Sequence, residues 1–497
     1  MDRMKLRSSY RSIVIMTVLI VVVLQPVSSQ SGLVRTGPDY HPSSEGYGHI
    51  SGVPYQWQEI NGFCHWSALS MALQYAGTPL DLGSLFAASG IGFSASYLRF
   101  EDLTMFLPGA FFKQMEPLPV IADIFGLNIS IYFDTDEGFG SVYSQALSGW
   151  GIEFTEINGW TGALELLKNT IDEGYPLEVW TDPYHLPPRD YDIARDLGLE
   201  SEETGSGHAV VVVGYNDTAC KVEIMDPGVG AGGIEFGYPD DGRWYYETNY
   251  TNLKDAWSPL GYGAVIVRPN GNVVGDFEES LVSYLLDRLR GDRTSYAAGF
   301  ENVFFWNFGA DAYRGLAVDL TPVGISDFLD EVSTTRETRC LYMKTLSMEL
   351  EGFLGIQYLS FRGALATLPS LLPDLNLEPF TDIGKESFPH FEAISDNATM
   401  VDYDYSGGNT ILTQTFDDII SAYETSGDLE AALSQNEVKL NEIQDHLLAI
   451  ADAWTAGAAS LESAYYGGTD ILLPLIVVSS TCIVVVSVVF ILQRRRV

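Results

Sequence analysis

A cysteine that opens a helical pattern is the residue in this sequence best suited to nucleophilic chemistry. Cys64 stands six residues after Gln58, and the apolar residues that follow it keep helical spacing up to a stop signal at Gly77. A thiol at a helix N-terminus lies in the positive end of the helix dipole, which favours the nucleophilic thiolate. The Gln58 amide could stabilise an oxyanion formed at that sulfur. This pair predicts acyl chemistry, provided that a histidine base lies nearby.

The histidine with the best context is His208, which opens a valine-rich strand. We expect that strand over 209–215, and a return strand over 221–225 that ends at Asp226. If the turn between them centres near Asp217, His208 and Asp226 face each other on one side of a hairpin. The carboxylate would then fix the imidazole tautomer and leave the other ring nitrogen for the thiol. A slip of one residue would put the two on opposite faces. Taken alone, His208 is better explained as a core histidine at the end of a strand.

Two regions with different patterns must position these residues. Between 31 and 270 one good helix is mixed with strand-like runs, which indicates an α+β domain. These runs cover residues 127–133, 177–181, 209–215, 221–225 and 263–268. From Gly275 onward the pattern becomes helical, and we expect an all-α domain over 276–465.

The clearest helical seam of the second region lies near its end. Its apolar residues, three and four positions apart, are Leu440, Ile443, Leu447, Ile450 and Trp454. Burial within the domain's own bundle explains this seam better than coiled-coil dimerisation, because the pattern lasts barely two heptads.

The order Gln58, Cys64, His208, Asp226 resembles papain-like cysteine peptidases, including the bacteriocin-leader-cleaving (double-glycine) peptidases. Their histidine segment also reads Gly-His, a valine-rich strand, Gly-Tyr and Asp-Pro, as residues 207–227 do here. A closer resemblance, over roughly residues 55–267, is to the N-terminal domain of butirosin biosynthesis protein H. The shared features are Gly77, Leu85-Phe86, Gly90-Ile91-Gly92-Phe93 and the stretch 182–187. The helical region also resembles the domain that follows in that family.

The resemblance implies a papain-like fold and acyl transfer through a thiol. It implies Cys64 as nucleophile, His208 as base, Asp226 as orienting group and Gln58 in the oxyanion role. Leader peptidases commonly have Asp-Cys-Gly at the nucleophile, whereas this chain has Phe-Cys-His.

The stretch 182–187 supplies two further candidates. Tyr184 and His185 could line the substrate cleft, and a structural role is the alternative for His185.

The ends of the chain predict where this chemistry takes place. Residues 1–30 have a basic start, an apolar run and small residues, a combination typical of a secretory signal, with an uncleaved anchor as the alternative. Residues 471–492 are uncharged and long enough to span a bilayer, and the tail 493–497 contains three arginines. We therefore expect a single-pass protein of the cell membrane, with an extracytoplasmic ectodomain and a short basic cytoplasmic tail.

Composition narrows the class of partner. The 497-residue chain has a net charge of −39, which repels phosphate backbones and argues against nucleic acid binding. A solvated acidic surface is a simpler explanation of this charge than a specific acidic site. With 46% hydrophobic residues the chain can still bury large cores. No His or Cys pair has convincing zinc spacing and no nucleotide-binding glycine motif stands in a suitable context, so we expect neither metal nor cofactor.

The four cysteines leave two disulfide arrangements open. Cys482 lies in the expected membrane span. In an oxidising exterior, Cys220 could pair with Cys340 and leave Cys64 free, as a nucleophile must be. A Cys64–Cys220 bridge is the rival arrangement, and it would abolish catalysis.

Together these observations predict a membrane-anchored, papain-like cysteine hydrolase with an α+β domain, a helical domain and a C-terminal transmembrane helix. Its substrate would be a peptide or another amide, cleaved through a Cys-His-Asp acyl-enzyme mechanism. The alternatives are an acyltransferase similar to butirosin biosynthesis protein H, and a catalytically inactive surface binding domain on the same scaffold.

Overall fold

The computed structural model describes most of the chain between its two ends. The described residues are 40–41, 46–60, 62–100, 103–111, 116–197, 207–229, 244–272, 275–291, 305–332, 335–396 and 410–467. The expected signal (1–30), membrane span (471–492) and tail (493–497) lie outside them. Among the helices that are described, none combines the length and apolar character needed to cross a bilayer.

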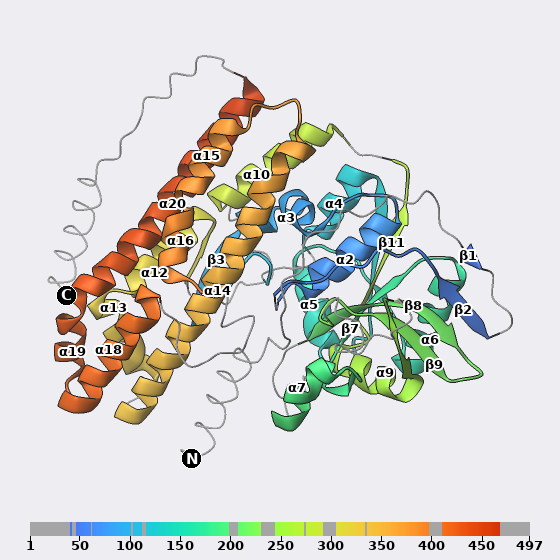
Figure 1. Ribbon diagram of the computed structural model, residues 1–497, viewed down its shortest axis with the longest axis horizontal. Coiled ribbons are helices and arrows are strands. Elements are labelled where there is room, and N and C mark those ends of the chain that lie inside the picture. Colours follow the sequence, from blue (N-terminus) through green and yellow to red (C-terminus); the bar gives the residue numbers. More distant parts are fainter. Residues whose placement is uncertain are drawn as a thin grey trace.

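A nine-stranded sheet forms the centre of the first region (Figure 1). Its main path runs β1-β2-β8-β7-β11-β5-β6, and β9 pairs with both β8 and β10. The strands are β1 (Tyr40–His41), β2 (Tyr47–Ile50), β5 (Leu127–Phe133), β6 (Thr155–Glu156), β7 (Leu177–Thr181), β8 (His208–Asn216), β9 (Lys221–Met225), β10 (Tyr246–Asn249) and β11 (Ala264–Pro269). All pairs are antiparallel except β5–β6. Three of the five strands expected from sequence have the bounds predicted, and the other two differ by one residue at each end.

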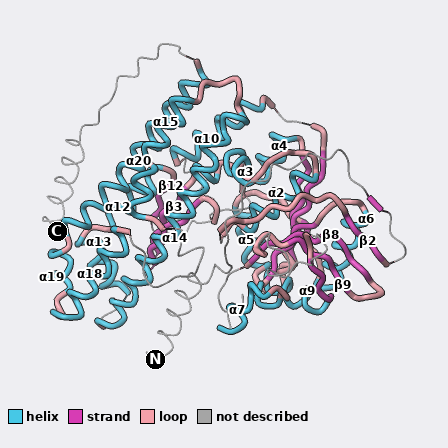
Figure 2. The backbone as a smooth tube through the Cα atoms, viewed as in Figure 1, coloured by secondary structure: helices cyan, strands magenta, loops and turns pink. Residues whose placement is uncertain are grey.

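Helices cover both faces of this sheet, as the magenta and cyan segments of Figure 2 show. The helices of this region are α2 (Cys64–Tyr75), α3 (Leu82–Ala88), α4 (Leu118–Phe125), α5 (Gly140–Gly149), α6 (Gly159–Asp172), α7 (Asp192–Leu197) and α9 (Tyr250–Trp257). Short 3-10 turns are η1 (Ile91–Phe93), η2 (Pro183–His185), η3 (Arg189–Tyr191) and η5 (Ser258–Leu260).

Strand β8 is buried on both faces because its side chains alternate between two cores. Val211 and Val213 join the core that contains α2, here called the α2-side core. Val210 and Val212 join the core on the other face, here called the opposite core, to which α6 and α9 contribute. The run of valines that marked this strand in the sequence is therefore explained by burial on two sides.

Helix α2 has the bounds expected from the sequence. It begins at Cys64, and its next nine residues are all buried. Its cap residue Ala76 is followed by Gly77, whose φ of 95° ends the helical conformation. The helix packs against β8, so its first residue is held near the strand that His208 opens.

The second region is helical but not all-α. Its helices are α10 (Phe277–Arg290), α12 (Ala310–Asp319), α13 (Pro322–Val332), α14 (Arg336–Leu371), α15 (Glu378–Glu386), α16 (Phe388–Ile394), α18 (Ile411–Ser426), α19 (Leu429–Gln435) and α20 (Glu437–Tyr466). The expectation of an all-α domain over 276–465 is wrong in one respect, because strand β12 (Phe305–Phe308) lies within it. This strand pairs with β3 (Ala95–Phe100), which also pairs with β4 (Leu103–Pro108). The edge of the β3–β4 hairpin, with main-chain groups that need partners, accounts for the extra strand.

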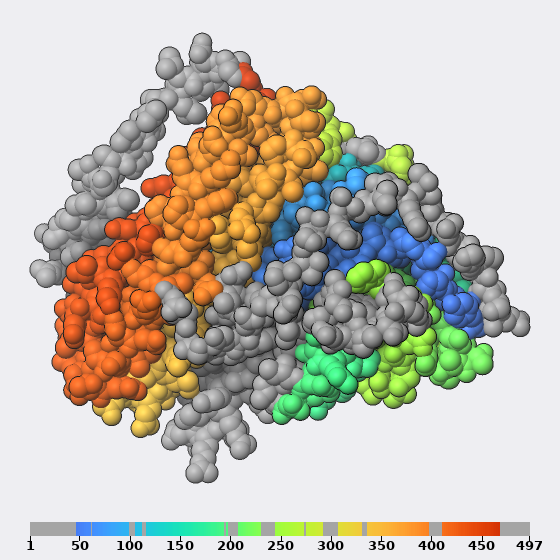
Figure 3. Space-filling view, viewed as in Figure 1, coloured from blue at the N-terminus to red at the C-terminus, as the bar shows by residue number. Residues whose placement is uncertain are grey.

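The two regions share one core. The α2-side core includes Trp66 of α2 and Leu354 of α14. The long helix α14 packs against α3 and η1, and Figure 3 shows the orange surface of the helical region bordering the blue surface of the first. Inside this contact the buried Gln357 side chain accepts from Gly109 N at 2.9 Å and donates to Gly92 O at 3.0 Å. The helical region is thus built onto the first region through both apolar and polar contacts.

The seam expected in the last helix is confirmed. Its residues lie in α20 and are all buried: Leu440, Ile443, Leu447, Ile450 and Trp454. They belong to the α2-side core, so burial within this chain accounts for them.

Neither of the two disulfides considered is present. Cys64, Cys220 and Cys340 are all free thiols. Cys220 is exposed in the turn between β8 and β9, whereas Cys340 is buried in α14. An exposed turn of the sheet and the interior of a helical bundle do not offer the close approach that a disulfide requires.

Candidate active site

Cys64, His208 and Asp226 come together at the start of strand β8. The Cys64 side chain lies close enough to the His208 ring to act on it electrostatically. His208 Nε2 lies 2.7 Å from Asp226 Oδ1. Because Nε2 is taken by the carboxylate, Nδ1 is the nitrogen that remains for the thiol. The His208 ring is therefore the neighbour of both a thiol and a carboxylate.

The contact between His208 and Asp226 arises from a different register than the sequence suggested. The turn covers 217–220, and Tyr215 pairs with Val222. A bulge between Val212 and Gly214 shifts the ladder, so that Val211 pairs with Met225. Continuing this ladder places Asp226 opposite Val210, which makes it the diagonal neighbour of His208 on the same face. The expected direct opposition is wrong, but the expected side-chain contact is present.

Asp226 is fully buried and receives several hydrogen bonds. The Gly228 main-chain N–H donates to Oδ1 at 2.9 Å. The Tyr191 hydroxyl lies 2.9 Å from both carboxylate oxygens, and the Tyr246 hydroxyl donates to Oδ2 at 3.0 Å. These donors replace the water that the carboxylate has lost on burial, and hydrogen bonds to the charged form favour it.

Tyr191 and Tyr246 are the residues of this site that the sequence did not reveal. Tyr191 ends η3, and Tyr246 begins β10, a strand that pairs with β9. Burial, and after it the charge of Asp226, raise the pKa of both hydroxyls well above the usual value of 10. Both therefore keep their protons and act as donors. Lone tyrosines in unrelated segments carry no spacing signal, so only the tertiary structure could identify them.

The electrostatics of the site favour a charged imidazole. Burial lowers the pKa of His208, but the charge and hydrogen bond of Asp226, followed by the contribution of Cys64, outweigh it and raise this pKa to about 10. A second carboxyl lies nearby on η3. Burial, and after it the charge of Asp226, raise the pKa of Asp190 to about 7. The site thus contains, besides Asp226, a second acid that takes up a proton near neutral pH.

The segment before the nucleophile is fastened to the turn after β9. The Gln58 main-chain N–H donates to Pro227 O at 3.0 Å, and the Gln58 side chain is 97% buried, with only 3% exposed. Gly62 adopts a φ of 96°, and a Cβ there would lie 2.2 Å from the Phe111 ring. The chain can therefore make this turn into Cys64 only because residue 62 is glycine.

Gly228 allows the chain to pass close beneath the histidine. Its conformation has no positive φ, but a Cβ there would lie 2.9 Å from His208 Cε1 and 2.8 Å from the Tyr191 hydroxyl. A methyl group at this position would press on both side chains. The Asp-Pro-Gly turn thus places the Asp226 carboxylate next to a residue without a side chain, which leaves room for the His208 ring.

Tyr184 and His185 lie in η2, between β7 and the η3 turn that carries Tyr191. Both are half-buried, and their rings pack edge to face with centroids 5.0 Å apart. Asp182 accepts from Tyr184 N at 2.9 Å and so caps the turn. Strand β7 leads into this turn, and its Thr181 pairs with His208. The structure places the two residues on the segment beside the site, and a substrate-lining role stays a prediction.

Four other described histidines are engaged elsewhere. His65, next to the nucleophile, points into the interior, where Nδ1 lies 2.6 Å from Glu178 Oε1. His49 pairs with Glu223 at 2.5 Å, and His390 with His446 at 2.9 Å. As expected for neighbours on a helix, Cys64 and His65 face different partners.

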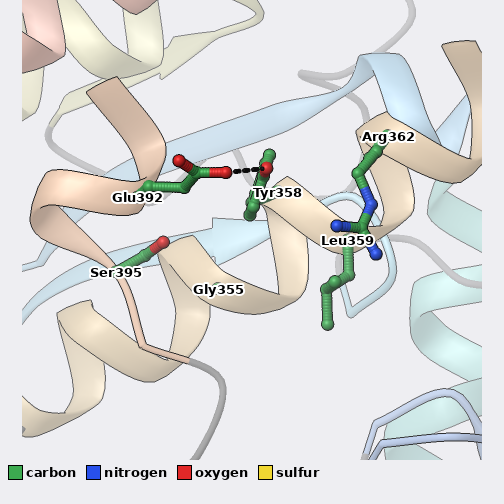
Figure 4. A pocket seen from close by; sticks show the side chains of 6 residues that line it. All are labelled: Gly355, Tyr358, Leu359, Arg362, Glu392 and Ser395. Atoms are coloured by element: carbon green, nitrogen blue, oxygen red, sulfur yellow. Dashed lines mark hydrogen bonds between the residues drawn. The ribbon is translucent and has the colours of Figure 1, made fainter. Parts of the chain in front are cut away.

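A pocket in the helical region has a different chemical character (Figure 4). It encloses about 200 Å³ and is lined by Gly355, Tyr358, Leu359, Arg362, Glu392 and Ser395. Its polar groups are engaged with one another, since Tyr358 donates to Glu392 at 2.7 Å and Arg362 packs over the Tyr358 ring. The Ser395 hydroxyl donates to Phe391 O, so it is not activated as a nucleophile. In the part of the chain that is described, no group of three or more His, Cys, Asp or Glu residues is arranged to hold a metal ion.

A known protein family matches the first region of the chain. Residues 50–262 match the model of the Peptidase_C39 like family. The matched segment contains α2, the β8–β9 hairpin and the segments that carry Tyr191 and Tyr246. Among curated proteins, no match to the chain is found. The chain therefore contains a papain-like, cysteine peptidase-like domain, followed by a helical region that this match does not cover.

Proposed function

We propose that the protein is a cysteine hydrolase that cleaves a peptide or another amide through an acyl-enzyme on Cys64. The observation that carries this proposal is the position of the His208 ring, which is bonded to Asp226 through Nε2 and is a close neighbour of the Cys64 side chain. A buried, hydrogen-bonded acid that orients a histidine toward a nucleophile is the arrangement that acyl transfer requires.

In the proposed cycle His208 takes the proton of the Cys64 thiol before the attack, which agrees with its raised pKa, and the Cys64 sulfur then attacks the substrate carbonyl carbon. The carbonyl oxygen gains the electron pair and is stabilised by the Gln58 amide. When the C–N bond breaks, His208 returns its proton to the leaving amine, and a thioester on Cys64 remains. Water then attacks the thioester while His208 accepts a proton, which releases the acid and restores the thiol.

Labelling with a thiol-directed, activity-based probe tests this proposal on the full-length chain. Because Cys220 is an exposed free thiol, the experiment is best done in a Cys220→Ser background, which removes a site of non-specific labelling. We expect rapid labelling of Cys64 that is lost in Cys64→Ala and slowed strongly in His208→Ala. Labelling of Cys64 no faster than that of a free thiol in solution would overturn the proposal and favour an inactive binding domain.

An acyltransferase similar to butirosin biosynthesis protein H is the competing activity, and the same acyl-enzyme can distinguish it. Addition of a primary amine to the acylated protein should leave the hydrolysis product dominant if water is the natural acceptor. A dominant amide product at millimolar amine would instead favour acyl transfer.

The proposal includes an outward-facing site on a membrane-anchored protein. Its support is the sequence of residues 1–30 and of the apolar run 471–492, which is followed by three arginines. Deletion of 471–497 should move the protein from the membrane fraction to the soluble secreted fraction. Retention in the membrane fraction after this deletion would contradict a C-terminal anchor.

A further inference from the structure

The buried carboxylate of Asp226 depends on two hydroxyl groups that the reaction does not consume. An ionised carboxyl group without exposure to water is costly unless donors surround it. Besides His208 and the Gly228 N–H, those donors are the hydroxyls of Tyr191 and Tyr246, each within 3.0 Å of a carboxylate oxygen. Between them the two hydroxyls reach both oxygens.

The two tyrosines are held rigidly and approach from separate elements. Tyr191 is completely buried at the end of η3, and Tyr246 is 4% exposed at the start of β10. Both rings belong to the opposite core of the sheet. The Tyr191 hydroxyl also lies 3.0 Å from His208 Nε2, so it contacts both members of the acid–histidine pair.

We infer that Tyr191 and Tyr246 are positioning residues, whose hydroxyls fix the orientation of Asp226 and limit the negative charge that it presents to His208. This inference rests on the proposed function, because it concerns the same thiol and histidine. It adds a specific task for two buried residues.

Loss of either tyrosine hydroxyl should raise the proton affinity of His208. Each hydroxyl draws part of the carboxylate charge toward itself. Loss of one hydroxyl therefore leaves more charge acting on the imidazolium, which then holds its proton to higher pH. Among the described residues, the other titratable groups that act on this pair are Cys64, which is a neighbour of the ring, and Asp190, whose pKa is affected by Asp226.

Alkylation of Cys64 by iodoacetamide, followed from pH 4 to 11 by mass spectrometry of the Cys64 peptide, measures this effect without a known substrate. The protein is the full-length chain in the Cys220→Ser background. The alkaline limb of the rate profile is the part above neutral pH, where His208 loses its proton. In Tyr191→Phe and Tyr246→Phe, we expect this alkaline limb to move upward by about one pH unit. The matched control is Tyr250→Phe, because the Tyr250 hydroxyl donates to a different carboxylate, Asp217, at 2.7 Å.

A second substitution guards against variants that simply fold poorly. Site-specific 3-fluorotyrosine at position 191 keeps the ring and makes its hydroxyl a stronger donor, so the limb should move downward. The inference would be overturned if the rate profiles of Tyr191→Phe, Tyr246→Phe and the 3-fluorotyrosine protein all coincided with that of the wild type. A shift of equal size in the control Tyr250→Phe would overturn it as well. If the wild type shows no enhanced reactivity of Cys64 at all, the proposed function itself fails and this inference falls with it.

Discussion

The main-chain N–H of Gln58 donates to the carbonyl oxygen of Pro227 at 3.0 Å, and this bond joins the segment before Cys64 to the turn that carries Asp226. Gln58 and Cys64 lie at the entry to α2, whereas Pro227 follows Asp226 at the end of β9. The bond thereby fixes the distance between the proposed oxyanion group and the histidine–carboxylate pair. Because it uses the backbone, the Gln58 side chain can be replaced without breaking it.

Replacement of Gln58 by alanine should slow acylation and leave alkylation unchanged. Formation of an acyl-enzyme from a p-nitrophenyl ester passes through an oxyanion, and loss of one donor to it costs about 10²–10³-fold in rate. Alkylation by iodoacetamide forms no oxyanion, so its rate should stay within about two-fold. Gln56→Ala is the control, because the Gln56 amide contacts only the neighbouring Trp57 carbonyl in the described structure. Equal losses in both reactions would indicate a structural role for Gln58.

Replacement of Gly228 by alanine should impair both the site and the stability of the protein. The new Cβ would lie under 3 Å from His208 and from the Tyr191 hydroxyl, and such overpacking typically costs about 1–3 kcal/mol. We expect a lower free energy of unfolding in urea and slower alkylation of Cys64. Gly162→Ala is the control, because a Cβ there meets nothing closer than 3.8 Å. Unchanged alkylation in Gly228→Ala would mean that the turn can yield without displacing the histidine.

Replacement of Gln357 by leucine should weaken the junction between the two regions. The Gln357 amide contacts the buried Gly109 N–H and Gly92 carbonyl, and leucine would remove both contacts, although the Gly109 N–H would keep Ser94 O as an acceptor. One unsatisfied buried group costs about 1–3 kcal/mol, so the free energy of unfolding should fall by that amount. Gln145→Leu, at an exposed site of α5, should change it by less than about 0.5 kcal/mol. A loss confined to that small range in Gln357→Leu would show that apolar packing alone holds the regions together.

Stability should fall as the pH rises above neutrality, in part through His208. Its pKa is raised to about 10 by Asp226 against the opposing effect of burial, so between about 6.5 and 10 the folded protein binds a proton that the unfolded chain has lost. This contribution is fully present below pH 6.5 and is lost as the pH rises through 10. The free energy of unfolding should therefore decline from pH 7 to 9 in the wild type more steeply than in His208→Gln. Parallel pH curves would show that the imidazole does not carry a raised pKa.

The hairpin of β8 and β9 shows how much of the candidate site residue spacing could predict. The valine run and the return strand were recognised from their residues, and the contact of His208 with Asp226 was expected. Its geometry was not, because the turn covers 217–220 and an odd shift would have placed the two side chains on opposite faces. The bulge at Val213 restores the common face. The position of the bulge depends on how the strand packs between two cores, and no residue of the valine run predicts it.

The identity of the candidate residues and the change of pattern along the chain are features of the local sequence, and the sequence alone determined them. Cys64 opens an apolar helix, His208 opens a buried strand, and the change to helical periodicity after residue 275 is visible without a structure. The tertiary structure decided everything that depends on residues far apart in the chain. It brought Tyr191 and Tyr246 to the carboxylate, added β12 to a hairpin of the first region and kept Cys220 apart from Cys340. Such contacts form when whole faces of helices and sheets pack together, so they cannot be predicted from any one segment of the sequence.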